Sequence, residues 1–269
     1  MFDESILDQI PVWVFFVGVL LTALLPIEVG QRIGELRRRR VDHEAESPVA
    51  NVVTATLALL GFMVALTLGA ATVRFDARKE ALIEGVNAIE TAYRNAGLLP
   101  EPHKSATRQL VRDYVEIRLD MHGLFSNASE LEKLEARVGS IRGQLWSHAE
   151  VLANEDRNSE VYALFASSLN EVFQVHNKRV ILGATYRIPL MVWIILIITT
   201  VITTFGVGFQ FGLVGNRSPV ASLALTLTFA LVMTIIFDID QPGKGLIQVN
   251  QQPMYQLLGR IKVDEQSNK

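Results

Sequence analysis

Four long stretches without a charged side chain constrain this chain of 269 residues more than any other feature. Their apolar cores are Pro11–Ile27, Val49–Val73, Pro189–Phe211 and Pro219–Phe237. A helix of about 20 apolar residues crosses a bilayer core about 30 Å thick, and each stretch comes close to that length or exceeds it. The sequence therefore predicts four transmembrane helices in a multi-pass protein of the cell (inner) membrane. For the first stretch the alternative is a cleaved signal peptide, but its leader MFDESILDQI is acidic where such peptides are basic, so we expect a retained span.

The region between the second and third spans is polar overall, yet it holds four series of apolar residues spaced three and four apart. Each series fits the period of a helix and none fits the alternation of a strand. We therefore predict an all-α integral membrane protein in which a bundle of long antiparallel helices is inserted between the second and third spans. The four series are Leu82, Val86, Ile89 and Tyr93; Leu110, Tyr114, Ile117, Met121 and Phe125; Leu131, Leu134, Val138, Ile141, Leu145 and Leu152; and Val161, Phe165, Leu169, Val172 and Val175.

The chain is thus expected to have four segments. Residues 1–73 hold the first two transmembrane helices, 74–186 the soluble bundle, 187–238 the last two transmembrane helices, and 239–269 a tail with a short helix at Met254–Lys262. Neither Pro nor Gly occurs between residues 73 and 77, so the second span is expected to continue into the first helix of the bundle.

The residue types argue against several classes of function. The chain has no cysteine, which excludes disulfides and thiolate chemistry, and its five histidines are scattered with no metal-binding motif. We find no catalytic set, metal site or cofactor motif, and a net charge of −3 gives no case for nucleic acid. The stretch GVGFQFG (Gly206–Gly212) resembles a phosphate loop only loosely, because it lies in an apolar span with no preceding strand. Small residues that let two helices approach closely explain it better.

A stripe of small and weakly polar residues runs along one face of the second span, with neighbours three or four residues apart. Such a face has two interpretations. It can be a seam where helices pack closely in lipid, or it can line a pore in which small side chains leave room for water and ions. In a ring of subunits both hold at once, and we expect the opposite side to be compatible with lipid. The residues are Asn51, Thr54, Ala58, Gly61, Ala65, Gly69 and Thr72.

Two further groups of charged residues lie at predicted membrane boundaries. Asp238 and Asp240 end the fourth span, where they are either ordinary interfacial residues or, repeated around an oligomer, a ring that attracts cations. The sequence NKR at Asn177–Arg179 either attracts anions or anchors a helix end at the lipid headgroups.

The layout of two spans, a helical insert, two more spans and a short tail resembles that of bestrophin-type channels. More specifically, the chain resembles the bestrophin-like family of bacterial and plant membrane proteins. The residues that carry the resemblance are LALLGFMVALTLGAATVRFDARKEALIEGVNAIETAYRNAGLLP (Leu57–Pro100) and DIDQPGKGLIQVNQQPM (Asp238–Met254). The resemblance implies a pentameric assembly that conducts small ions. Bestrophins conduct chloride through an aromatic neck on the second span, and here that span offers only Phe62, beside the stripe.

We therefore expect a homo-oligomeric ion channel, or a channel-like protein, with the second span lining the pathway. The alternative is a non-conducting membrane sensor or scaffold whose bundle binds a partner; an enzyme is not expected. Arg32 and Arg37–Arg40 lie in the connector after the first span, and positive charge in short loops prefers the cytoplasm. This places the bundle outside the cytoplasm, whereas the resemblance to bestrophins implies the reverse.

Overall fold

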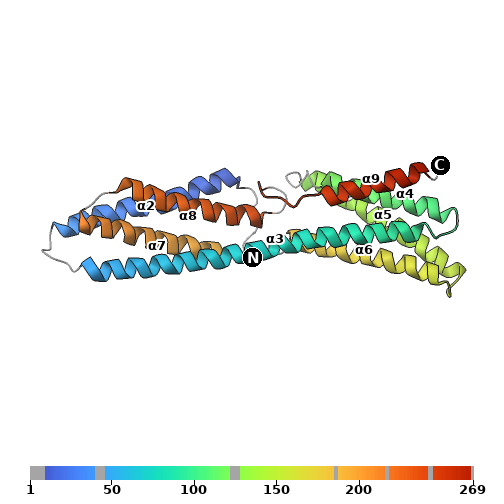
Figure 1. Cartoon of the computed structure of the whole chain (residues 1–269), viewed down its shortest axis with the longest axis horizontal. Helices are drawn as coiled ribbons and strands as arrows, with labels where there is room; N and C mark the ends of the chain where they lie inside the picture. Colours follow the sequence, from blue (N-terminus) through green and yellow to red (C-terminus); the bar gives the residue numbers. More distant parts are fainter. Residues whose placement is uncertain are drawn as a thin grey trace. The chain divides into compact units, whose positions relative to one another are not determined.

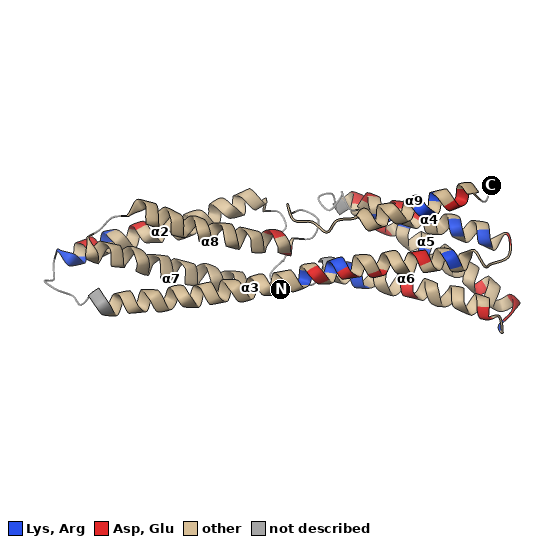
Figure 2. Ribbon diagram, in the orientation of Figure 1, with Lys and Arg blue, Asp and Glu red and all other residues tan. Residues whose placement is uncertain are grey.

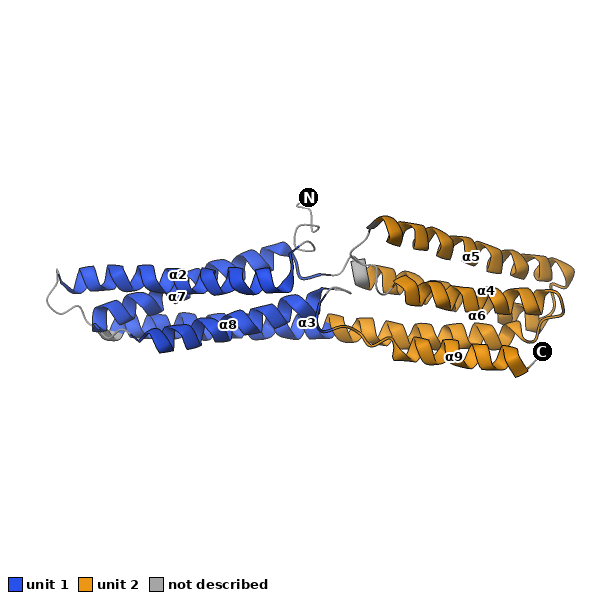
Figure 3. Cartoon of the chain, turned by 90° about the horizontal axis from the view of Figure 1, so that it is seen from above, with its two compact units in different colours: residues 1–73, 187–241, 245–247 blue, residues 74–186, 242–244, 248–269 orange. Residues whose placement is uncertain are grey.

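A computed structural model of the chain describes residues 10–39, 46–121, 128–184, 187–215, 218–241 and 245–267. Within these ranges the backbone forms eight α-helices and no strand, which confirms the predicted all-α class. The chain divides into two compact units, shown in Figure 3. Unit 1 comprises residues 1–73, 187–241 and 245–247, and unit 2 comprises residues 74–186, 242–244 and 248–269.

Unit 1 consists of α2 (Val12–Arg38), the first part of α3 (Glu46–Ala96), α7 (Leu190–Val214) and α8 (Pro219–Asp240) (Figure 1). All four helices are long and apolar enough to cross a membrane, so the structure holds four candidate spans at the four predicted places. In Figure 2, α7 carries no coloured charge and α8 carries charge only at its end.

Proline, glycine and serine mark the ends of these helices. Pro11 precedes α2 and Pro189 precedes α7, each with an extended backbone that does not continue a helix backwards. Gly215 ends α7 with φ at 77°, a left-handed conformation that favours glycine. Ser218 caps α8 by accepting a hydrogen bond from the backbone N–H of Ala221.

The contact between α2 and α7 depends on glycine. A Cβ atom at Gly208 would collide with the backbone of Ile27, and Gly30, Gly34 and Gly212 meet the backbone of the facing helix in the same way. The two helices therefore touch backbone to backbone, as small residues allow between helices in lipid. The interpretation of GVGFQFG as a close-packing sequence is confirmed.

The helix α3 is continuous from Glu46 to Ala96, so the second span does run into the first helix of the bundle. Its apolar part belongs to unit 1 and its charged part to unit 2, and the change in composition is visible along the helix in Figure 2. Gly97 and Pro100, a glycine and a proline that do not favour a helix, follow its end.

Unit 2 contains the second part of α3 together with α4 (His103–Asp120), α5 (Ala128–Glu155), α6 (Glu160–Ala184) and α9 (Gln252–Ser267). Most residues of the four predicted apolar series form its core, from Leu82 to Val172. Val161 is an exception because 38% of its surface is exposed. Phe125 lies outside the described residues.

The last helix, α9, is longer than the predicted short helix and is part of the core of unit 2. Met254, Leu257 and Ile261 are buried in that core. Asp264 accepts hydrogen bonds from Tyr93 of α3, at 3.0 Å, and from Arg108 of α4, at 2.9 Å. The tail of the chain is therefore hydrogen-bonded to two other helices of the unit, α3 and α4.

Candidate functional site: the small-residue face of α3

The stripe predicted on the second span lies on the membrane part of α3, and the structure exposes all of it. We call the residues Asn51, Thr54, Ala58, Gly61, Ala65, Gly69 and Thr72 the α3 stripe; each is exposed in the single chain. A Cβ atom at Gly61 or Gly69 would meet nothing within 4 Å. Among the residues that the structure describes, the α3 stripe is therefore an uncovered face, available to another copy or to water.

The membrane part of α3 has two other faces. Val53, Leu60, Val64, Thr67 and Ala71 are buried against the rest of unit 1. A third face exposes large apolar side chains. At about 100° per residue, the α3 stripe is centred about 130° from the buried face and about 100° from the large apolar face. The side away from the α3 stripe is thus divided, and only part of it is open to lipid. The members of the large apolar face are Val52, Leu59, Phe62, Leu66 and Val73.

The α3 stripe differs from the seam that this chain uses internally. At the contact of α2 and α7, the glycines touch the facing backbone. Gly61 and Gly69 have the same small surface, but no residue that the structure describes covers them. The α3 stripe therefore forms no seam with the described part of its own chain, and the open alternatives are a seam between copies and a pore lining.

Polar groups at the two ends of the α3 stripe are unequally satisfied. Thr72 Oγ1 donates to the carbonyl of Leu68, at 2.9 Å, within the same helix. Asn51 and Thr54 form no side-chain hydrogen bond with any described residue. An amide in hydrocarbon without a partner costs several kcal/mol, and no described residue supplies a partner for Asn51, so water or another chain is a favourable environment for this end.

Asp238 and Asp240, predicted to attract ions, are both engaged within unit 1. Asp238 is 3% exposed, and its two carboxylate oxygens each accept a backbone N–H, from Leu246 and Ile247, at 2.7 Å. Asp240 accepts the N–H of Ile188 at 3.1 and 3.3 Å. These donors offset the unfavourable placement of carboxylates at the C-terminus of a helix. The structure thus gives both residues a structural task that we did not predict, and their ion-attracting role stays a hypothesis.

The histidines do not assemble a metal site within the part of the chain that the structure describes, where no group of three or more ligand residues occurs. His103 Nδ1 and His148 Nδ1 lie 2.9 Å apart, and His148 is partly buried. Burial and the neighbouring His103 lower the pKa of His148. This pair is a local contact between α4 and α5.

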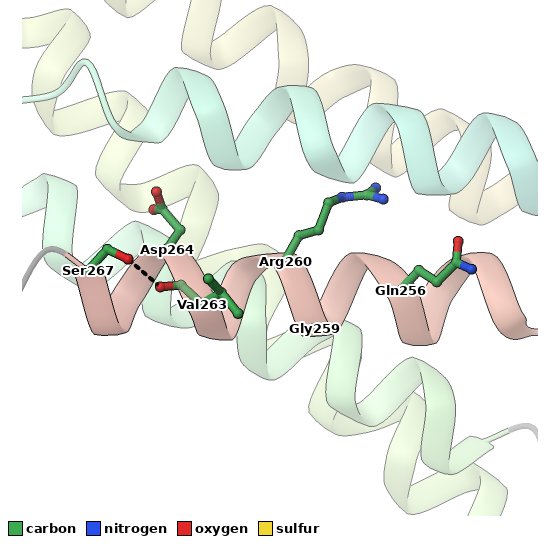
Figure 4. Close-up of a pocket in the computed structure, with 6 residues that line it drawn as sticks. All are labelled: Gln256, Gly259, Arg260, Val263, Asp264 and Ser267. Carbon is green, nitrogen blue, oxygen red and sulfur yellow. Dashed lines mark hydrogen bonds between the residues drawn. The ribbon is translucent and has the colours of Figure 1, made fainter.

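A hollow of about 640 Å³ lies on the surface of α9 (Figure 4). Arg260 and Asp264 point to the same side of α9 there. Arg260 pairs with Glu90 of α3 at 2.7 Å, and Asp264 binds Tyr93 and Arg108. The charged groups of the hollow therefore fasten α9 to the bundle.

Comparison with known proteins gives one family and a set of similar folds. The bestrophin-like domain matches residues 8–254 of this chain. A crystal structure of a point variant of a bacterial bestrophin homologue from Klebsiella pneumoniae is similar, with 18% identity and a TM-score of 0.67, over 92% of this chain and 96% of that chain. A crystal structure of a membrane-protein variant matches with 20% identity and a TM-score of 0.64, also over 92% and 96%. At such identity the likeness shows the fold alone. Comparison with curated protein sequences gives no match.

Proposed function

Because the chain belongs to the bestrophin-like family, we propose that it forms a homo-oligomeric ion channel of the cell (inner) membrane in which α3 lines the pathway. Family membership supports a membrane protein of the channel type, and the shared fold and the four apolar helices agree with it. The number of copies that the family resemblance implies is five.

The observation that carries the proposal is the exposure of the complete α3 stripe. Such a face is poorly suited to lipid, because large apolar side chains make better dispersion contacts with lipid and no described residue of the chain supplies a partner for Asn51. A water-filled axis suits it, since small side chains leave room and the polar end meets water.

The three faces of α3 fit a ring of copies. The buried face holds α3 to its own chain, and the α3 stripe turns toward a shared axis. The large apolar face, about 100° away by helical geometry, then turns toward a neighbouring copy or lipid. Each face of the helix has one environment in this arrangement.

Single cysteines test the proposal well, because the chain has none of its own. We would place them at Thr54, Gly61 and Ala65 in the assembled protein and add a membrane-impermeant, water-soluble thiol reagent. A water-filled pathway predicts modification at all three positions. Protection of all three, in a protein that still assembles, would contradict the proposal and leave a dry seam between copies.

The matched control is the large apolar face of the same helix. Leu59 and Leu66 are exposed in the single chain and lie within two residues of Gly61 and Ala65 along the helix. Cysteines there should resist the reagent, because lipid or a neighbouring copy covers them. Equal labelling of both faces would show local opening of the protein rather than a defined pathway.

A further inference from the structure

Unit 2 contains a group of cationic side chains that the channel proposal does not use. Arg118 of α4 lies 3.2 Å from His176 of α6, and Arg142 of α5 reaches Asn177, the next residue of α6, at 3.4 Å. Arg179 follows on α6, three residues after His176. Each is at least partly buried, and three different helices supply them. We call these three residues the arginine cluster. It includes the last residue of the NKR sequence, for which anion attraction was one of two interpretations.

The contacts of His176 define its protonation state. Its ring is buried, and Nδ1 lies 3.2 Å from Arg118 Nη1 and 3.2 Å from the hydroxyl of Tyr114. A guanidinium can only donate, so Nδ1 is an acceptor and the proton sits on Nε2. Burial, and then the three arginines, lower the pKa of His176 to about 3. His176 is therefore neutral and leaves the charge of the arginine cluster unbalanced.

The arginine cluster has little compensating negative charge. No carboxylate among the described residues forms an ion pair with Arg118, Arg142 or Arg179. The nearest acidic contact is that of Glu135, whose Oε2 lies 3.8 Å from Nε2 of His176. Three guanidiniums thus face one carboxylate.

The remaining contacts of the arginines are neutral. Arg142 donates to the Asn177 side chain at 3.4 Å, and its guanidinium lies 4.7 Å from the centre of the Phe173 ring. Arg179 runs beside Gly85 of α3, where the missing side chain leaves it room. Its neighbour Lys178, in contrast, pairs with Glu84 at 2.7 Å.

Partly buried guanidiniums without a counter-ion are costly. Burial, and then the charge of Arg118, lower the pKa of Arg179 to about 9. Removing a cation from water is repaid only by an opposite charge held in good geometry. The planar fork of arginine suits oxyanions, which accept two parallel hydrogen bonds.

We propose that the arginine cluster binds a small oxyanion of the phosphate or sulfate class inside the bundle, between α4, α5 and α6. The anion supplies the charge that the chain lacks and joins three helices of unit 2 through one ligand. This site does not depend on ion conduction, so failure of the channel proposal would not contradict it, and its own failure would not contradict the channel.

The test uses the purified full-length protein and inorganic phosphate, titrated by calorimetry in chloride buffer of matched ionic strength. We expect saturable binding at one site per chain, with sulfate competing and chloride not. Arg179→Gln should weaken binding at least about tenfold, the worth of one charge-assisted hydrogen bond. Arg137→Gln is the matched control, because Arg137 is an exposed arginine on α5 outside the arginine cluster; its binding should not change.

A variant that binds phosphate more tightly than the wild-type protein separates the proposed site from misfolding, because a misfolded protein is not expected to gain affinity. Glu135→Gln removes the one nearby negative charge and should tighten phosphate binding several-fold. The proposal is overturned if the wild-type protein takes up no phosphate saturably, or if Arg179→Gln and Arg137→Gln bind alike. If Arg179→Gln does not assemble, Glu135→Gln decides, and unchanged or weaker binding there rejects the site.

Discussion

Replacement of Asp238 by Asn tests the hydrogen bonds at the end of α8. The two oxygens of Asp238 each accept a backbone N–H at 2.7 Å, from Leu246 and Ile247. Hydrogen bonds to a charged group contribute about 1.5–3 kcal/mol each. Asn keeps one acceptor and turns an NH₂ group toward the other N–H, so it loses at least one bond and adds a conflict. Because Leu246 is 89% exposed as a residue, the freed amide can reach water, and we take about 3 kcal/mol for the local loss.

Amide hydrogen exchange measures this loss where it occurs. A local cost of about 3 kcal/mol corresponds to exchange about 100-fold faster at the two amides. Asp120→Asn is the control, since Asp120 is exposed on α4. Unchanged exchange at Leu246 and Ile247 in Asp238→Asn would refute the reasoning and return Asp238 to the role of a boundary charge.

Three further predictions concern other parts of the chain. Because the pKa of His176 is lowered from 6.5 to about 3, unfolding takes up a proton below pH 6.5. The stability of unit 2 should therefore fall between pH 6.5 and pH 3, by at most about 1.4 kcal/mol per pH unit, and His176→Gln should flatten this slope in thermal unfolding. Gly208→Ala should destabilise the α2–α7 contact by about 1–3 kcal/mol in thermal unfolding, whereas Gly61→Ala, which adds a methyl group in open space, should not. The positive charge of the connector predicts that protease added to intact spheroplasts cuts the bundle; a shielded bundle would place it in the cytoplasm.

The main elements of the fold were predictable because their signals are local. Charge-free stretches mark the four spans, and apolar residues three and four apart mark the bundle helices. The continuity of α3 followed from the absence of Pro and Gly after Val73. The role of α9 was not predicted, because the amphipathic pattern of a short helix does not say which core it joins. Only the structure shows Met254 and Ile261 in the core of unit 2.

Among the candidate sites, too, some could be predicted from the sequence and others could not. The α3 stripe could be predicted because all its members lie on one helix, and the structure adds that no described residue covers it. The arginine cluster could not be predicted from the sequence, since Arg118, Arg142 and Arg179 lie on three helices with no shared spacing. The hydrogen bonds of Asp238 were not predicted because their donors are backbone N–H groups of a loop. Almost every residue type has such a group, so the sequence does not indicate where these donors lie.

The central claim is that α3 lines an ion pathway, and the current through a Gly61→Cys protein in a planar bilayer tests it most directly. The account predicts a current that falls when a charged, water-soluble thiol reagent is added and returns when a reductant removes the adduct. Gly61 suits the test because a side chain there has open space within the single chain. Leu59→Cys, on the large apolar face, should conduct with and without the reagent. A protein that assembles without any current, or a Gly61→Cys current that the reagent leaves unchanged although the thiol is modified, would contradict the account.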